Sequence, residues 1–212
     1  MAEVGCLKDG NFQNLEVSST LMQGGNVLKV AGYQLITTTG AGETTAGSDL
    51  TPNGIHFLAV DAAGDVAANN ETITLPAAGT GLNIGDFFTF VVVRASTHAT
   101  GFTITTAADD KIVGVCELRS VAAAAIVADA TARGGASTAA TNNLDLVGDI
   151  SAAGVNKIVL DGGSGTDVAG AAGTQITLTY VGNPDGTNAM YYVSGTITSI
   201  DPNGTAATTF AN

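Results

Sequence analysis

Short runs of β-branched and aromatic residues alternate along this chain with clusters of Gly, Asn, Asp and Pro. In residues 71–76 (ETITLP) apolar and Thr side chains alternate, as in a half-buried strand. Residues 87–94 (FFTFVVVR) form a continuous apolar run, which is typical of a strand buried on both faces. We expect further strands at residues 26–39, 55–60, 102–106, 111–121, 157–160, 174–181 and 189–200. This pattern predicts an all-β protein, built as an antiparallel β-sandwich or a barrel-like body.

Two turn signals predict hairpins. Residues 183–186 (NPDG) lie between two good strands, where Pro fixes φ and Gly permits a tight turn, so residues 174–200 read as a hairpin. Asp109 and Asp110 separate residues 102–106 from residues 111–115 and predict a second, tighter hairpin.

The segment at residues 120–133 (SVAAAAIVADATAR) is the best helix candidate, because its four consecutive alanines favour a helix. Its Val and Ile residues can equally extend the preceding strand. Residues 134–143 are a polar, low-complexity stretch. We therefore expect a first β-rich domain at residues 27–133, followed at residues 134–212 by a second β-rich domain or a continuation of the first.

Charge narrows the possible partners. The chain has 7 Lys and Arg against 19 Asp and Glu, a formal net charge of −12, and this excess of acid disfavours nucleic acid as a partner. The longest apolar runs, at residues 87–93 and 121–128, are shorter than the roughly 18 residues that a membrane-spanning helix needs. The first ten residues show no export signal. We expect assembly in a cytosol, with no membrane contact.

Residues suited to catalysis or metal binding are few and scattered. His56, His98, Cys6 and Cys116 show neither metal-ligand nor nucleophile spacing, so we expect no enzyme activity, no cofactor, no metal and two free thiols. Residues 162–170 (GGSGTDVAG) match one copy of a calcium-binding nonapeptide, but a single copy cannot form a site between stacked turns. A weak surface cation site at Asp161, Asp167 and Asp149 stays open as an alternative.

Four short motifs then occur in a distinctive order: TITLP at residues 72–76, FTFVV at 88–92, TIT at 103–105 and DKIVG at 110–114. Residues 157–162 (KIVLDG), 192–195 (YVSG) and 209–211 (TFA) continue the series. In this order the chain resembles the small β-rich virion surface proteins of tailed bacteriophages, particularly marine ones, over residues 55–212. It departs from them at Tyr192, where Trp is often found.

The resemblance implies a structural virion protein without catalytic residues. The first reading is a capsid decoration (cement) protein, which stabilises the outer capsid surface by binding the major capsid protein as a homotrimer. Symmetric sites on a shell favour cyclic oligomers. The alternative is a tail or head fibre module that binds a host-surface receptor, although the chain has neither a long repetitive stalk nor heptads.

The first 26 residues differ from the rest of the chain. Five apolar residues lie there without a strand or helix period, and they are the candidate partner-binding residues: Phe12, Leu15, Val17, Leu21 and Met22. Residues 1–30 carry a net charge of −1, from two Lys against three acidic residues, so −11 remains for the other residues. We expect an arm that anchors the protein to its shell or to a neighbouring subunit. The alternative is an element packed on its own domain.

Deletion of residues 1–25 tests the arm. We expect the truncated protein to keep its thermal melting temperature, because the strands begin after this segment, yet to lose co-sedimentation with particles or its oligomeric state. Normal binding and assembly would contradict the anchor hypothesis. Unfolding would instead indicate a locally packed terminus.

Overall fold

The structure, a computed structural model, contains two compact units, Met1–Val30 and Ala31–Asn212, which are treated separately. It describes residues 22–23, 26–27, 32–61, 69–77, 80–98, 100–107, 109–120, 144–147, 154–161, 170–183, 188–199 and 210–211. In the first unit, β1 (Met22–Gln23) pairs antiparallel with β2 (Asn26–Val27). The predicted partner-binding residues Phe12, Leu15, Val17 and Leu21 lie outside the described residues, as does the side chain of Met22.

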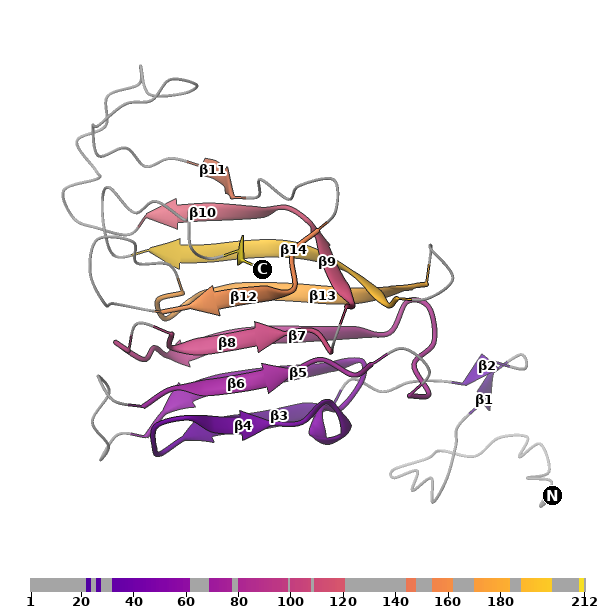
Figure 1. The fold of residues 1–212 in the computed structure, drawn as a ribbon, viewed down its shortest axis with the longest axis horizontal. Coiled ribbons are helices and arrows are strands. Elements are labelled where there is room, and N and C mark those ends of the chain that lie inside the picture. The colour runs from indigo at the N-terminus through magenta and orange to yellow at the C-terminus, as the bar shows by residue number, and fades with distance from the viewer. Residues whose placement is uncertain are drawn as a thin grey trace, which may run out of the picture. The chain divides into compact units, whose positions relative to one another are not determined.

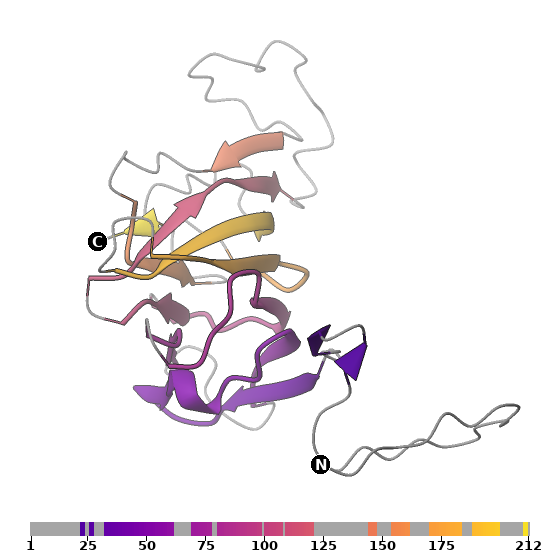
Figure 2. The same cartoon turned by 90° about the vertical axis from the view of Figure 1, so that its right-hand side faces the viewer.

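The second unit is a two-layered β structure (Figures 1 and 2). The large sheet has the strand order β11 (Leu144–Val147), β10 (Cys116–Ser120), β14 (Met190–Ser199), β13 (Gln175–Gly182), β7 (Phe87–Arg94), β5 (Gly54–Val60) and β3 (Tyr33–Thr38), and β9 (Lys111–Gly114) also pairs with β14. The small sheet has the order β15 (Phe210–Ala211), β12 (Lys157–Leu160), β8 (Phe102–Thr105), β6 (Glu71–Thr74) and β4 (Glu43–Thr45). The described part of the chain contains no α-helix, only the short 3-10 turn η1 (Gly47–Asp49). The predicted all-β, sandwich-like fold is confirmed.

Strands β3 to β8 alternate between the two sheets in chain order. β3, β5 and β7 lie side by side and parallel in the large sheet, and β4, β6 and β8 do so in the small sheet. Parallel neighbours need a crossover between them, and here the crossover is a strand of the opposite sheet. This half of the fold is therefore a stack of three two-strand coils.

The predominantly antiparallel pairing that we predicted is wrong for this half. An alternating pattern shows which side chains face the core, but it does not say on which sheet the next strand lies. The predicted hairpin at Asp109 and Asp110 fails for the same reason, because β8 belongs to the small sheet and β9 to the large one. Asp110 holds this crossing in place: its Oδ1 accepts the Ala189 N–H at 2.7 Å, and its carbonyl accepts the Thr106 hydroxyl at 2.7 Å.

The later strands extend both layers. β13 adds antiparallel to β7, β12 adds antiparallel to β8, and the predicted hairpin over residues 174–200 is confirmed as β13–β14. A single hydrophobic core includes residues from both predicted β-rich regions, among them Phe88 and Tyr191, whose ring centroids are 6.5 Å apart. The predicted boundary at residues 133 and 134, with almost all of the helix candidate, lies outside the described residues.

Strand β7 shows how the sequence divides between core and surface. Phe88, Phe90 and Val92 point inward and are fully buried. Burial of each such side chain contributes about 1.5–3 kcal/mol. Among the outward side chains of the same strand, Thr89 is buried, Phe87 and Val91 are partly covered, and Val93 is 49% exposed. The prediction that both faces of this apolar run are buried is therefore wrong for the outer face.

Strand β14 has two parallel partners in succession, because the predicted strand at residues 111–121 is interrupted. Its first half is β9 and its second half is β10, with Val115 between them. At the end of β9, Gly114 has φ 124°, and a Cβ there would lie 2.2 Å from the carbonyl oxygen of Val193 on β14. Only glycine fits this close approach of two backbones.

We predict that Gly114→Ala destabilises the protein much more than Gly81→Ala. Both glycines have a positive φ, but a Cβ at Gly81 meets nothing within 4 Å. Gly81→Ala should therefore show only the backbone strain, about 1–2 kcal/mol, whereas Gly114→Ala should exceed about 3 kcal/mol. The free energy of unfolding in urea measures both. Equal losses would contradict the close approach of β9 and β14.

Candidate interaction surface

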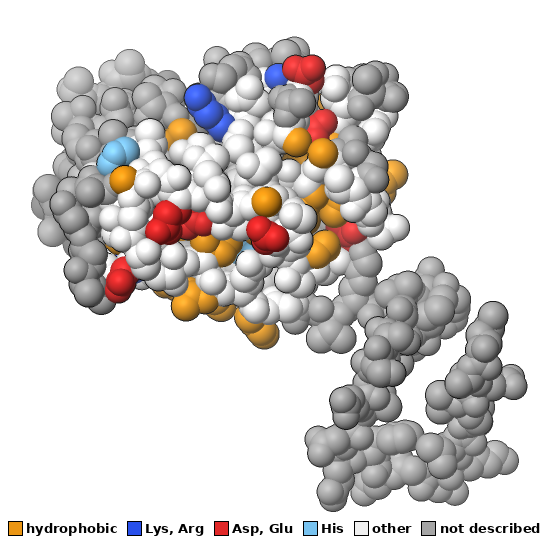
Figure 3. All heavy atoms as spheres, turned by 60° about the horizontal axis from the view of Figure 1, so that its bottom comes forward, with side chains coloured by type: hydrophobic (Ala, Val, Ile, Leu, Met, Phe, Trp, Pro, Cys, Tyr) orange, Lys and Arg blue, Asp and Glu red, His pale blue; other side chains and the backbone are white. Residues whose placement is uncertain are grey.

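The outer face of the large sheet carries no acidic side chain on five adjacent strands. Its outward residues on β3, β5, β7, β13 and β14 are Tyr33, Leu35, Thr37, Ile55, Phe57, Ala59, Phe87, Thr89, Val91, Val93, Gln175, Thr177, Thr179, Val181, Met190, Tyr192, Ser194, Thr196 and Thr198. An ordinary solvated surface is roughly 25–35% charged. Figure 3 shows acidic side chains near the β3–β4 end of the fold, with hydrophobic side chains along one rim.

One end of this face is apolar. We call Tyr33, Leu35, Ile55, Phe57, Val91 and Val93 the apolar patch. Leu35 lies beside Phe57, and Phe57 beside Val91, in the register of three parallel strands. The rings of Tyr33 and Phe57 are stacked, with centroids 6.3 Å apart and an interplanar angle of 5°. Tyr33 is nevertheless 74% exposed and Leu35 65% exposed. Exposed apolar clusters of this kind mark interaction sites.

The apolar patch continues to a sheet edge. Among the described strands β3 pairs with β5 alone, so one side of its backbone is unpaired. Its sequence, YQLITT, contains no charge and no Pro, the residues that commonly keep a second chain from pairing with an edge strand. The patch and the edge together offer another protein both side-chain and backbone contacts.

The outer face of the small sheet gives a contrast. Its outward residues on β4, β6 and β8 are Thr44, Thr72, Thr74, Thr103 and Thr105. These hydroxyl-bearing side chains suit contact with water. On strands β3 to β8 the exposed large hydrophobic side chains therefore lie on the large sheet.

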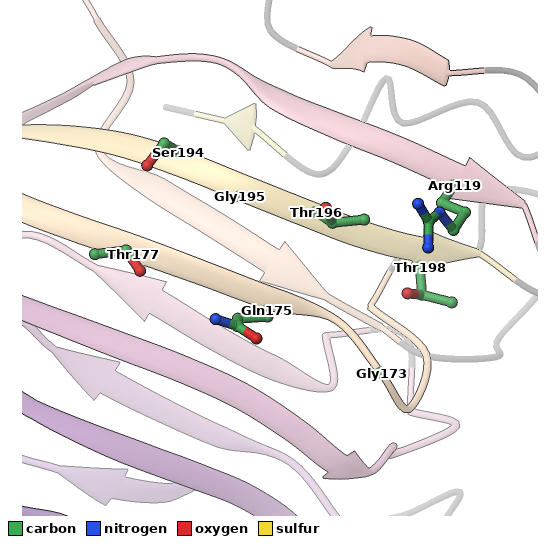
Figure 4. Close-up of a pocket in the computed structure, with 8 residues that line it drawn as sticks. All are labelled: Arg119, Gly173, Gln175, Thr177, Ser194, Gly195, Thr196 and Thr198. Carbon is green, nitrogen blue, oxygen red and sulfur yellow. The ribbon is translucent and has the colours of Figure 1, made fainter.

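The other end of the large sheet's face is a polar groove, with a cavity of about 350 Å³ between strands β10, β13 and β14. We call it the polar groove; it is lined by Arg119, Gly173, Gln175, Thr177, Ser194, Gly195, Thr196 and Thr198. In Figure 4 the Arg119 side chain reaches from β10 over β14 toward Thr198. Arg119 forms no ion pair with any residue that the structure describes. The Thr177 hydroxyl shares a hydrogen bond of 2.9 Å with the Thr89 hydroxyl.

Among the described residues, His56, His98 and Cys116 have structural roles. His56 is fully buried between the rings of Phe88 and Phe90, and this burial lowers its pKa below the ordinary value. Cys116 is a free buried thiol whose pKa is raised to about 12 by burial, so it stays protonated and unreactive. His98 accepts the Thr100 N–H at Nδ1 over 3.1 Å.

Two carboxyl groups, the partly covered Glu43 and the buried Glu71, lie at one end of β4 and β6. Glu43 and Glu71 are direct neighbours in register. The Glu43 carboxylate accepts the hydroxyl of Thr39 at 2.8 Å and its backbone N–H at 3.1 Å, and the hydroxyl bond is the main cause of its lowered pKa. Burial raises the pKa of Glu71, and the charge of Glu43 raises it further, against the Thr45 hydroxyl that donates to Glu71. The second carboxyl oxygen of Glu71 has no hydrogen-bond partner in the described structure.

Clusters of metal-binding side chains and membrane-spanning helices are absent from the residues that the structure describes. No three His, Cys, Asp or Glu side chains gather there in a group that could hold a metal ion. No helix in that part is long and apolar enough to cross a bilayer. Of the three candidate cation ligands, Asp161 is buried next to β12, and Asp149 and Asp167 fall outside the described residues.

Neither the apolar patch nor the polar groove was found from the sequence. The patch has a weak signal, since residues 33–37 and 55–59 place apolar side chains on both faces of each strand. The groove has no local signal, because residues 119, 173–177 and 194–198 meet only through strand pairing. Comparison with known protein families, with curated proteins and with solved structures gives no match for this chain.

We predict that Glu71→Gln stabilises the protein at pH 7 and has little effect at pH 4. Because the pKa of Glu71 is higher in the folded chain than in the unfolded chain, the folded state holds more protons above the unfolded value near 4.5. The stability that this group supplies is therefore present at low pH and is lost as pH rises through the folded pKa. Thermal melting at both pH values measures the effect.

Glu43→Gln is the matched control, with the opposite sign. The pKa of Glu43 is lowered in the folded chain, so its contribution is present above pH 4.5 and disappears in acid. This variant should be neutral or slightly destabilised at pH 7. A loss of stability in Glu71→Gln at pH 7, equal to the loss at pH 4, would contradict the description of Glu71.

Proposed function

We propose that this protein is a structural component of a tailed-phage virion, which decorates and stabilises the outer surface of the capsid. It binds the major capsid protein and associates with itself as a homotrimer. The observation that carries the proposal is the apolar patch, an exposed apolar cluster on a chain with a net charge of −12. The resemblance of the sequence to phage virion surface proteins indicates the kind of particle to which the patch attaches.

The energetics of the apolar patch suit attachment to another protein. Burial of Tyr33 or Leu35 contributes about 1.5–3 kcal/mol each, before the ordering of side chains and the loss of free motion are subtracted. One copy therefore binds modestly. Many copies that also contact one another on a shell gain strength from their simultaneous attachment.

The distribution of charge also supports attachment of the apolar patch to another protein. The chain carries a net charge of −12, yet the apolar patch and the strands beside it have no acidic side chain. Charge repulsion therefore does not oppose contact at this face. The remaining acidic groups favour a solvated exterior once the protein is attached.

We also infer a non-enzymatic protein. His56 and Cys116 are buried, and the pKa shift of each group disfavours its charged form. The alternative function, a fibre module that binds a receptor on the host, is favoured by one observation, the polar groove. It remains the second candidate.

Leu35→Glu should weaken binding to capsids at least tenfold, because it places an unpaired charge in the apolar patch. The measurement is co-sedimentation of the full-length protein with capsids of the phage that encodes it, prepared without this protein. Thr44→Glu is the control: it makes the same change of charge at an exposed position on the other edge strand, β4, and should bind like the wild type. Equal binding of Leu35→Glu and the wild type would contradict the role of the patch.

Immunogold electron microscopy of complete virions distinguishes the two candidate functions. Label over the head supports the decoration protein. Label confined to the tail would overturn it in favour of the fibre module.

A further inference from the structure

We propose that the polar groove is a binding site for a neutral, hydroxyl-rich saccharide. This inference goes beyond attachment to a shell, and it uses different residues from the apolar patch. Its basis is the juxtaposition of unpaired hydrogen-bonding side chains, a locally balanced charge and an exposed aromatic ring on one sheet face.

The strand register brings the hydrogen-bonding groups together. Thr196 on β14 lies beside Gln175 on β13, and Ser194 lies beside Thr177. Arg119 on β10 lies beside Thr198 at the end of the groove. These outward side chains form rows across three adjacent strands, so a chain of sugar rings can contact several of them at once.

Most of these groups are free to bind a ligand. The side chains of Gln175, Ser194 and Thr196 make no hydrogen bond to any other residue in the described part of the chain. Together they offer amide and hydroxyl groups, each of which both donates and accepts. This combination suits sugar hydroxyls, which also donate and accept. The lining contains no large apolar side chain, whereas the buried centre of a protein–protein interface is typically apolar.

Local charge favours a neutral ligand over an anionic one. Arg119 lines the groove, and Glu117, which is beside Thr196 in register, points outward from the same strand, so charged groups of both signs lie on this face. The whole chain carries −12, which repels polyanions. A guanidinium and a carboxylate on the same face can instead hydrogen-bond neighbouring hydroxyls of one sugar.

Tyr192 supplies an apolar surface at the side of the groove. It precedes Ser194 by two residues on β14, faces the same way and is 46% exposed. The face of an aromatic ring packs well against the C–H face of a pyranose, while its hydroxyl stays in water. The cavity of about 350 Å³ is at the small end of the range for ligand sites, which indicates a short saccharide segment.

The test uses the full-length protein on an array of neutral oligosaccharides, from dimers to hexamers of glucose, mannose and galactose, with sialylated and uronic-acid counterparts. We expect binding to at least one neutral series and weaker or no binding to the acidic counterparts. Absence of binding to every neutral probe, or binding to acidic probes alone, would overturn the proposal.

Two variants test whether the saccharide binds in the polar groove. The double variant Gln175→Leu with Thr196→Val keeps side-chain size and removes three hydrogen-bonding groups, so its affinity for the neutral probe should fall at least tenfold in calorimetry. Thr72→Val, on the outer face of the small sheet, is the matched control and should bind like the wild type. Unchanged affinity in the double variant would overturn the assignment to the groove.

Co-sedimentation with capsids distinguishes a failure of the saccharide site from a failure of the proposed function. The double variant should still co-sediment, because the apolar patch is intact. If it loses both capsid and saccharide binding while its melting temperature is unchanged, the groove is part of the protein interface, and the saccharide site is rejected.

Discussion

Most described strands of the second unit bury one side in a single core that two sheets share. The chain meets this constraint in β3 to β8 by passing from one sheet to the other after each strand, so that successive strands of one sheet become parallel neighbours. β12, β13 and β14 then extend the same two layers. Inward side chains, such as those of Phe88 and Tyr191, therefore pack in the core. Only the outward side chains of these strands can contact a partner or ligand.

The sequence predicts the strands well, because alternation and β-branched content respond to burial in the core. The strands at residues 87–94 and 157–160 have the expected bounds, and the hairpin over residues 174–200 follows from its turn. The sequence predicts less well whether neighbouring strands pair in parallel or antiparallel directions. A turn such as Asp109-Asp110 has the same composition whether the chain folds back in one sheet or crosses to the other. The crossing follows from the pairing of β8 with β6 and of β9 with β14.

The candidate surfaces also depend on how the strands pair, which the sequence does not show. Leu35 and Phe57 look like ordinary strand residues until their register places them together on an outer face. Gln175 and Thr196 are 21 positions apart in the sequence and meet only across β13 and β14. Glu71 differs from these residues, because the alternation in residues 71–76 already places it on the same inward face as Ile73. The predicted arm at residues 1–26 stays a prediction.

We propose that the outer face of the large sheet is the surface through which the protein binds its partners. Hydroxyl-radical footprinting of the protein, free in solution and attached to its particle, tests this most directly. The account predicts strong protection of Tyr33, Leu35 and Phe57 on the particle, with little change at the threonines of β6 and β8. Protection of the small sheet, with Tyr33 and Leu35 as reactive as in free protein, would contradict it.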